Sequence, residues 1–212
     1  MCRLLLVRSE KPFPVIDHLQ PFSRIAEESK EYQGHGWGCA FLQNGAWNVY
    51  KNIHPIWKDN LDRFGSTTLL MGHARSAFQN EGIRIENNMP FLSGEIVFVF
   101  NGELQKVRIP VEGRIGAEKI FNFILRFHKN NLFDAICKGT DIIEKRARYI
   151  RAMNMLLSDK KNVYLVSQFN EDPDYFTMHM KKSLETLILC SEPYPGDQGW
   201  EKIANHSRKV FP

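Results

Sequence analysis

The chain has 212 residues, of which 43% are hydrophobic and 25% are charged, and its formal net charge is +4. This composition is typical of a globular protein with one well-buried core, and we expect a single domain over residues 1–212. The apolar runs at residues 4–7 and 96–100 are far shorter than the roughly 18 residues of a membrane-spanning helix, which excludes a membrane protein.

The cysteines and the charged segments favour a cytoplasmic protein. The four cysteines are widely spaced and form no C-x-x-C pair, which argues against a zinc site or a disulfide framework. Glu10 and Lys11 follow the short N-terminal apolar run, so no secretory signal is predicted. The basic stretch at residues 145–151 falls within a helical pattern and is interpreted as a solvated helix face rather than a nucleic-acid surface.

In the first half of the chain, short apolar and alternating segments predict strands at residues 1–8, 36–42, 46–51, 67–73, 95–100 and 104–109. Residues 15–30 have helical spacing, with a break or kink at Pro21. Asn44-Gly45 is the favoured pair for a two-residue hairpin turn, and Asn101-Gly102 links the last two predicted strands.

The period changes after residue 115. Helices are predicted over 116–129 and over 132–158, the second with a break at 138–140. Strands return at 162–168, 175–180 and 184–190. This order, with strands first, helices in the middle and strands again, favours a layered α+β sandwich over alternating βαβ units.

Cys2 is the first candidate for chemistry, because it directly follows Met1. If Met1 is removed, Cys2 carries both a thiol and a free α-amino group, so the nucleophile has its own base attached. The amino group titrates near ~7.7–8.0 and the thiol near ~8.5, so a proton can pass between them close to neutral pH. The alternative interpretation is that Cys2 only begins a buried strand.

Three further stretches carry polar residues at strand ends. They are Gly72-His73-Ala74-Arg75-Ser76-Ala77, Phe100-Asn101-Gly102-Glu103-Leu104 and His35-Gly36-Trp37-Gly38. In isolation, Asn101-Gly102 indicates a hairpin turn, Arg75 a surface ion pair and Trp37 a packing anchor. His35, His54 and His73 lack a tight ligand spacing, so no metal site is predicted.

Taken together and in this order, these motifs resemble the class II glutamine amidotransferases, which are N-terminal-nucleophile (Ntn) hydrolases. The resemblance rests on N-terminal Met-Cys-Arg, Gly-His-x-Arg-x-Ala, Asn-x-x-Pro-Phe at residues 87–91 and Phe-Asn-Gly-Glu-Leu. Ser191-Glu192-Pro193 followed by Trp200 is similar to the short branch that lacks a fused synthase domain.

The resemblance implies a fold and a set of roles. The fold would be an αββα four-layer sandwich with two antiparallel sheets. Cys2 would attack a γ-glutamyl amide to form a thioester, and Asn101 with the backbone N–H of Gly102 would form the oxyanion hole. Arg75 would bind the substrate α-carboxylate, and Trp37 is a further candidate for substrate binding. No cofactor or metal is needed for this chemistry.

The chain also departs from the family pattern. Phe100 and Met89 stand where the family usually has histidines, and Gly116 stands where it has an aspartate that holds the α-amino group of glutamine. Polar groups around the substrate are thus replaced by apolar or small ones, while the nucleophile and oxyanion positions remain.

Three hypotheses follow from this pattern. The first is an amidohydrolase acting on a γ-glutamyl amide or another acyl amide, with Glu118 or another acid in place of the missing aspartate. The second is a glutaminase that supplies ammonia to a synthase partner subunit. The third is a catalytically inactive relative that serves as a binding or assembly module.

Overall fold

The structure is a computed structural model that describes residues 1–212. It contains two antiparallel sheets. The larger has seven strands in the order β11-β9-β10-β1-β4-β2-β3. These strands are β1 (Arg3–Pro14), β2 (Trp37–Gln43), β3 (Ala46–Asn52), β4 (Ser66–Ala74), β9 (His179–Lys182), β10 (Thr186–Cys190) and β11 (Glu201–Lys202).

The smaller sheet has five strands in the order β12-β8-β7-β6-β5. They are β5 (Phe91–Ser93), β6 (Ile96–Gln105), β7 (Tyr149–Ser158), β8 (Val163–Ser167) and β12 (Ser207–Phe211). The helices are α1 (Ile16–Glu27), α2 (Gly116–Leu125), α3 (Leu132–Arg146) and α4 (Pro173–Phe176), with short 3-10 helices η1 (Ile56–Lys58), η2 (Asp62–Phe64), η3 (Phe78–Asn80) and η4 (Ile85–Asn87). None of the helices combines the length and the apolar stretch needed to cross a bilayer.

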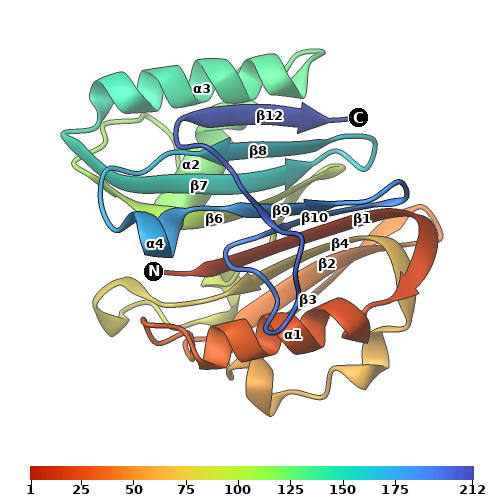
Figure 1. Cartoon of the computed structure of the whole chain (residues 1–212). Coiled ribbons are helices and arrows are strands. Elements are labelled where there is room, and N and C mark those ends of the chain that lie inside the picture. Colours follow the sequence, from red (N-terminus) through yellow and green to blue (C-terminus); the bar gives the residue numbers. More distant parts are fainter.

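Helices cover the outer face of each sheet. Helix α1 lies on the seven-stranded sheet, and α2 and α3 lie on the five-stranded sheet (Figure 1). The two sheets face each other between these helix layers. The predicted fold class, an α+β sandwich of two antiparallel sheets flanked by helices, is therefore confirmed.

Strand β1 shows why the chain opens with an uninterrupted apolar run. Successive side chains of a strand point to opposite faces. Leu4 and Leu6 pack in the core between the sheets, whereas Leu5 and Val7 pack under α1. Because β1 is central in its sheet and covered on both faces, all four side chains are fully buried.

The predicted helix over residues 132–158 is wrong in its second half. Helix α3 ends at Arg146, and residues 149–158 form strand β7 in the middle of the smaller sheet. This strand is covered on both faces, so it lacks the alternation that distinguishes a strand from a buried helix. The predicted break at 138–140 is also absent, because Gly139 lies inside α3 and lets it approach Ile124 of α2 closely.

Two more strand predictions are corrected. The predicted strands 95–100 and 104–109 are not separate elements joined at Asn101-Gly102, because β6 runs through this pair without a turn. Its pairing with β7 continues on both sides, with one irregularity between Glu103 and Leu104. Residues 175–180 do not form one strand either, because α4 occupies Pro173–Phe176 and β9 begins only at His179.

Candidate active site

Cys2 lies immediately before β1, at the end of a central strand (Figure 1). Its Sγ is 3.6 Å from the carbonyl oxygen of Ser76, which follows β4. The ammonium group of Met1, the residue before Cys2, pairs with Glu31. Strand β1 pairs with β10 on one side and with β4 on the other, and this pairing fixes the main chain next to the thiol.

The surroundings of Cys2 affect the pKa of its thiol in opposite directions. Burial raises the pKa of the Cys2 thiol above its ordinary value, and this effect is the largest. The N-terminal ammonium group, a contact with the Ser76 carbonyl and the Arg75 guanidinium lower this pKa in part. With Met1 attached, the nitrogen of Cys2 belongs to a peptide bond and cannot accept the thiol proton.

Asn101 lies on β6 and faces the other sheet. Phe98 and Phe100 stack on each other, and Phe98 stacks on Phe121 of α2, so these rings point toward the helix layer. By strand alternation, Asn101 points to the opposite side, toward the seven-stranded sheet. Its side chain is 1% exposed, and neither its Oδ1 nor its Nδ2 has a hydrogen-bond partner. Most buried amides have hydrogen-bond partners, so the two unpaired atoms of Asn101 require an explanation, and a catalytic role is one.

Contacts across the two sheets bring the N-terminus to this part of β6. The Met1 side chain packs against a small cluster that contains Ala152 of β7. Ala152 is the register partner of Glu103, and its carbonyl oxygen lies directly against Gly102. The residue that precedes the thiol thus lies beside the strand pair that carries Asn101-Gly102.

Gly102 has no space for a side chain. A Cβ atom there would lie 2.1 Å from the Ala152 carbonyl oxygen and 2.7 Å from the Phe100 ring. Glycine at this position is therefore needed for the close approach of β6 to β7. Gly102 therefore serves the close contact between two paired strands, and Asn101-Gly102 forms no hairpin turn.

Arg75 lies just beyond β4, and the residue as a whole is buried. Its Nη1 donates to Asn88 Oδ1 at 3.0 Å and its Nη2 to the Gly82 carbonyl at 2.9 Å. Both partners come from the loop between β4 and β5, and Asn88 belongs to the Asn-x-x-Pro-Phe motif. His35 supports the same segment, because its Nδ1 accepts a hydrogen bond of 2.9 Å from the N–H of Ala77.

His73 is a residue of this region for which the sequence predicts no role. It lies opposite Leu4 in the pairing of β4 with β1 and is fully buried, and neither ring nitrogen has a hydrogen-bond partner. Burial, with help from the Arg75 and Lys51 charges, lowers the pKa of His73 to about 3. The ring lies beside the main chain of Phe100, so a neutral imidazole fills the space between the two sheets. The Gly-His-x-Arg motif contains this residue and is the signal that could have found it.

Trp37 points to the face of the seven-stranded sheet that α1 covers, away from the other sheet. Its indole is fully buried in the core under α1, and its Nε1 donates to Asp59 Oδ2 at 2.9 Å. The Phe64 ring packs against it edge to face. The structure therefore places Trp37 in the packing of the outer layer and does not bring it together with Cys2 and Asn101.

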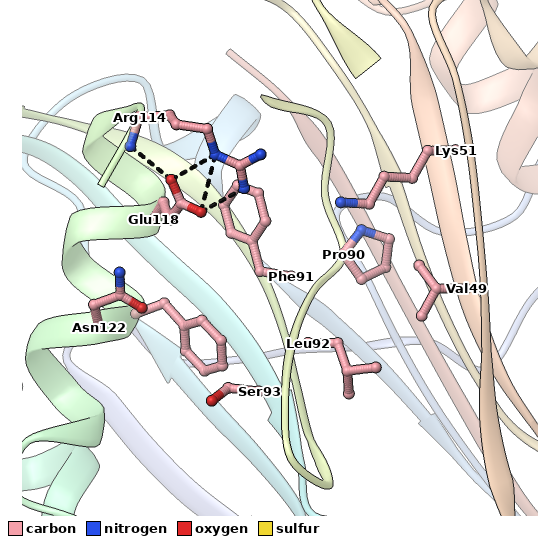
Figure 2. A pocket seen from close by; sticks show the side chains of 10 residues that line it. Val49, Lys51, Pro90, Phe91, Leu92, Ser93, Arg114, Glu118 and Asn122 are labelled. Atoms are coloured by element: carbon pink, nitrogen blue, oxygen red, sulfur yellow. Dashed lines mark hydrogen bonds and ion pairs between the residues drawn. The ribbon is translucent and has the colours of Figure 1, made fainter. Parts of the chain in front are cut away.

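A pocket of about 350 Å³ lies between β3, β5 and the start of α2 (Figure 2). Lys51 and Arg114 both lie over the Phe91 ring, at 5.1 and 5.8 Å from its centroid. Burial, followed by the Arg114 charge, lowers the pKa of Lys51 to about 8. The pocket is therefore basic, and Cys2 does not line it.

Glu118, in the first turn of α2, is held by Arg114. Its carboxylate accepts from the Arg114 backbone N–H at 2.6 Å and from the guanidinium Nε at 2.9 Å (Figure 2). The hydrogen bonds from Arg114 lower the pKa of Glu118, so the carboxylate stays ionised. Gly116 begins α2, and a Cβ atom built there would meet no other atom within 4 Å.

Comparison with known proteins identifies similar folds and one distant relative. No family model matches the chain. The γ-glutamyl-hercynylcysteine sulfoxide hydrolase of Mycobacterium tuberculosis is 22% identical over an alignment of 180 positions, which covers 79% of this chain and 71% of that protein.

The similar solved structures cover nearly the whole chain. A glutamine aminotransferase class-II domain protein of Silicibacter pomeroyi has a TM-score of 0.66 at 14% identity, with 99% of this chain and 94% of that chain covered. A predicted glutamine amidotransferase of Pseudomonas aeruginosa has a TM-score of 0.63 at 15% identity, with 99% of this chain and 97% of that chain covered. The glutamine phosphoribosylpyrophosphate amidotransferase of Bacillus subtilis gives 0.65 at 14%, with 90% of this chain and 42% of that chain covered. The chain thus has the Ntn-hydrolase-type fold of the class II glutamine amidotransferases, as its sequence motifs predicted.

Proposed function

We propose that this chain is an N-terminal-nucleophile amidohydrolase that cleaves a γ-glutamyl amide and uses Cys2 as nucleophile after removal of Met1. One observation carries the proposal: Asn101 presents a fully buried side-chain amide with no partner, on the strand that faces the N-terminus. A preorganised amide donor without a partner in the protein is what an oxyanion hole needs. The fold and the distant hydrolase relative support the same reaction class.

In the proposed reaction, the α-amino group of Cys2 accepts the thiol proton, and Sγ attacks the amide carbonyl carbon. Asn101 Nδ2 and the Gly102 N–H donate to the resulting oxyanion. The C–N bond then breaks, the leaving amine takes the proton from the α-ammonium group, and a thioester remains on Cys2. Water hydrolyses the thioester and releases the acid. All groups come from a single domain over residues 1–212, and no step requires a metal or cofactor.

Arg75 is assigned to the substrate carboxylate, although two of its donors are engaged by the protein. The guanidinium has five N–H donors, so bonds to Asn88 and Gly82 leave others free for an anion while fixing its plane. Loss of the family aspartate at Gly116 removes one charged contact to free glutamine. We therefore favour a substituted γ-glutamyl amide as substrate over glutamine hydrolysed for a synthase partner.

Intact mass spectrometry before and after incubation with diazo-oxo-norleucine, a glutamine-like electrophile, tests this proposal. We expect a mass without Met1 and a single adduct on Cys2. Cys2→Ala should give no adduct, whereas Cys137→Ala, which changes a thiol on α3, should label like the wild type. Processed protein that takes up no label would contradict a glutamine-shaped site and favour a non-catalytic binding role.

A further inference from the structure

Met1 occupies a defined recess beside Cys2. Only 10% of its side chain is exposed. The apolar part packs against the cluster formed by Ala152, Phe169, Tyr175 and Phe176, which belongs to β7, α4 and the segment between β8 and α4. The N-terminus lies next to α4 in Figure 1, in agreement with these contacts.

The polar atoms of Met1 are also held. Its carbonyl oxygen accepts from Gln33 Nε2 at 2.6 Å and from the Tyr175 hydroxyl at 2.5 Å. Gln33 is fully buried, and its Oε1 has no partner. Burial also raises the pKa of Tyr175 to about 12, so its hydroxyl remains a donor. Once Met1 is removed, the Tyr175 hydroxyl loses the acceptor that it contacts here, whereas Gln33 Nε2 keeps the Glu31 carbonyl oxygen at 2.7 Å.

The rim of the recess carries an excess of negative charge. The Arg151 guanidinium forms ion pairs with three carboxylates. Its Nη2 lies 3.6 Å from Glu31 Oε1, its Nη1 lies 3.6 Å from Glu103 Oε2, and its Nε lies 3.2 Å from Glu171 Oε2. The ammonium group of Met1 supplies the second positive charge through its pairing with Glu31. Removal of Met1 moves the N-terminal amino group to Cys2 and takes the ammonium group away from its place against Glu31. Arg151 then remains as the guanidinium that faces these three carboxylates, so the emptied rim attracts a cation.

We propose that this Met1 recess binds the leaving-amine portion of the substrate, and that the substrate is a γ-glutamyl amide of an amine with an apolar body and a positive charge. The inference rests on the proposed function. In that reaction the leaving nitrogen takes its proton from the α-amino group of Cys2, so it must lie within hydrogen-bond reach of the nitrogen to which Met1 is joined. The substituent on the leaving nitrogen then extends into the volume that Met1 fills.

Three γ-glutamyl amides of similar length test the proposal, with cadaverine, hexylamine and aminocaproate as the leaving amines. They end in a cation, a methyl group and a carboxylate, respectively. The protein is released from a fusion by cleavage directly before Cys2, and intact mass verifies the loss of Met1. We expect kcat/KM for the cadaverine amide to exceed that for the hexylamine amide by about two- to fivefold, with the aminocaproate amide slowest.

Substitutions at Glu31 separate specificity from a structural effect. Glu31→Gln should bring the ratio of kcat/KM for the cadaverine and hexylamine amides close to one, and Glu31→Lys should favour the aminocaproate amide. A ratio cancels any change that the substitution causes at Cys2 itself. Glu185→Gln, which removes a carboxylate paired with Lys11 far from the recess, is the matched control and should keep the wild-type ratio.

The outcomes distinguish the leaving-group site from the proposed function. Equal kcat/KM values for the three amides, or hydrolysis of glutamine with none of the three amides cleaved, would overturn the recess as leaving-group site and leave the proposed function standing. Failure of processed protein to hydrolyse glutamine and all three amides would overturn the proposed function and this inference with it. An inverted preference in Glu31→Lys would support the proposal directly.

Discussion

Asn101 and Asn154 are register partners on β6 and β7, yet their side chains have opposite hydrogen-bonding states. Asn154 Nδ2 donates to the Phe176 carbonyl at 2.6 Å, and its Oδ1 accepts from the Gln168 N–H at 3.2 Å. Asn101 makes neither kind of bond. The pair therefore offers a comparison of a structural amide with one that the proposed mechanism uses.

Asn101→Ala should lower kcat by ~10²–10³, because one oxyanion donor is lost. It should change the free energy of unfolding by less than about 1 kcal/mol, since no hydrogen bond is removed. Asn154→Ala should instead destabilise the protein by about 1–3 kcal/mol, because two buried backbone groups lose their partner. Kinetics with a γ-glutamyl amide and urea unfolding measure both quantities. An unchanged kcat in Asn101→Ala would remove Asn101 from the oxyanion role.

His73 makes the stability depend on pH. Its pKa is about 3 in the folded protein against an ordinary value of 6.5, so between these pH values the unfolded chain binds a proton that the folded chain refuses. The free energy of unfolding therefore falls as the pH drops below 6.5, by about 2 kcal/mol at pH 5. His73→Gln should remove this part of the loss in urea unfolding at pH 7.5 and pH 5. An equal loss in both proteins would mean that His73 is protonated when folded.

At the scale of elements, two glycines illustrate opposite reasons for the same residue type. Gly102 lies in β6 against the backbone of β7, whereas Gly116 begins α2 with nothing within 4 Å of the place that a methyl group would take. The first glycine is needed for contact between two strands. The second is a matched control, because alanine fits there and favours the helix.

Gly102→Ala should lower the free energy of unfolding by about 1–3 kcal/mol, since the methyl group would collide with the Ala152 carbonyl and push β6 from β7. Gly116→Ala should raise it by about 0.4–1 kcal/mol. Thermal or urea unfolding of the two variants gives the comparison. Equal stability of Gly102→Ala and the wild type would show that β6 and β7 tolerate a wider separation there.

The sequence predicts elements well where only one interpretation of the pattern exists. Asn44-Gly45 correctly indicates the turn between β2 and β3, and the helical spacing after residue 115 correctly starts α2 at Gly116. Strand β7 escapes prediction because burial on both faces removes its period, and β6 is divided in the prediction because Asn-Gly is more often a turn. The local sequence pattern does not show which other elements pack against a segment. That packing determines the structure of both β6 and β7.

The candidate site is predictable only in part for a similar reason. The motifs point to Cys2, Arg75 and the Asn101-Gly102 pair, and their roles remain proposals. Glu31, Gln33 and Tyr175 have no signal in the sequence, because they meet at Met1 only when the segment after α1 and α4 come together. Such a contact depends on the tertiary fold rather than on spacing.

At the scale of the whole molecule, the two cores share strand β1. Leu6 lies in the core between the sheets, and Leu184 lies in the turn before β10 with its side chain fully exposed. Leu6→Ala should lower the free energy of unfolding by about 2–5 kcal/mol because it leaves a cavity between the sheets. Leu184→Ala should change it by less than about 0.5 kcal/mol. Urea unfolding tests both, and a small effect of Leu6→Ala would mean that the two sheets can close the gap.

The burial of Met1 has a consequence for the order of events during synthesis. The residues that enclose it, Ala152, Phe169 and Tyr175, leave the ribosome long after the N-terminus does. An aminopeptidase needs an extended, accessible end, and the folded protein no longer offers one. If Cys2 is the nucleophile proposed above, Met1 must therefore be removed while the chain is still growing. Under that proposal, a molecule that folds with Met1 in place keeps this residue enclosed and its thiol without a base, and we expect the fraction of active chains to depend on the rate of translation relative to the rate of Met1 removal.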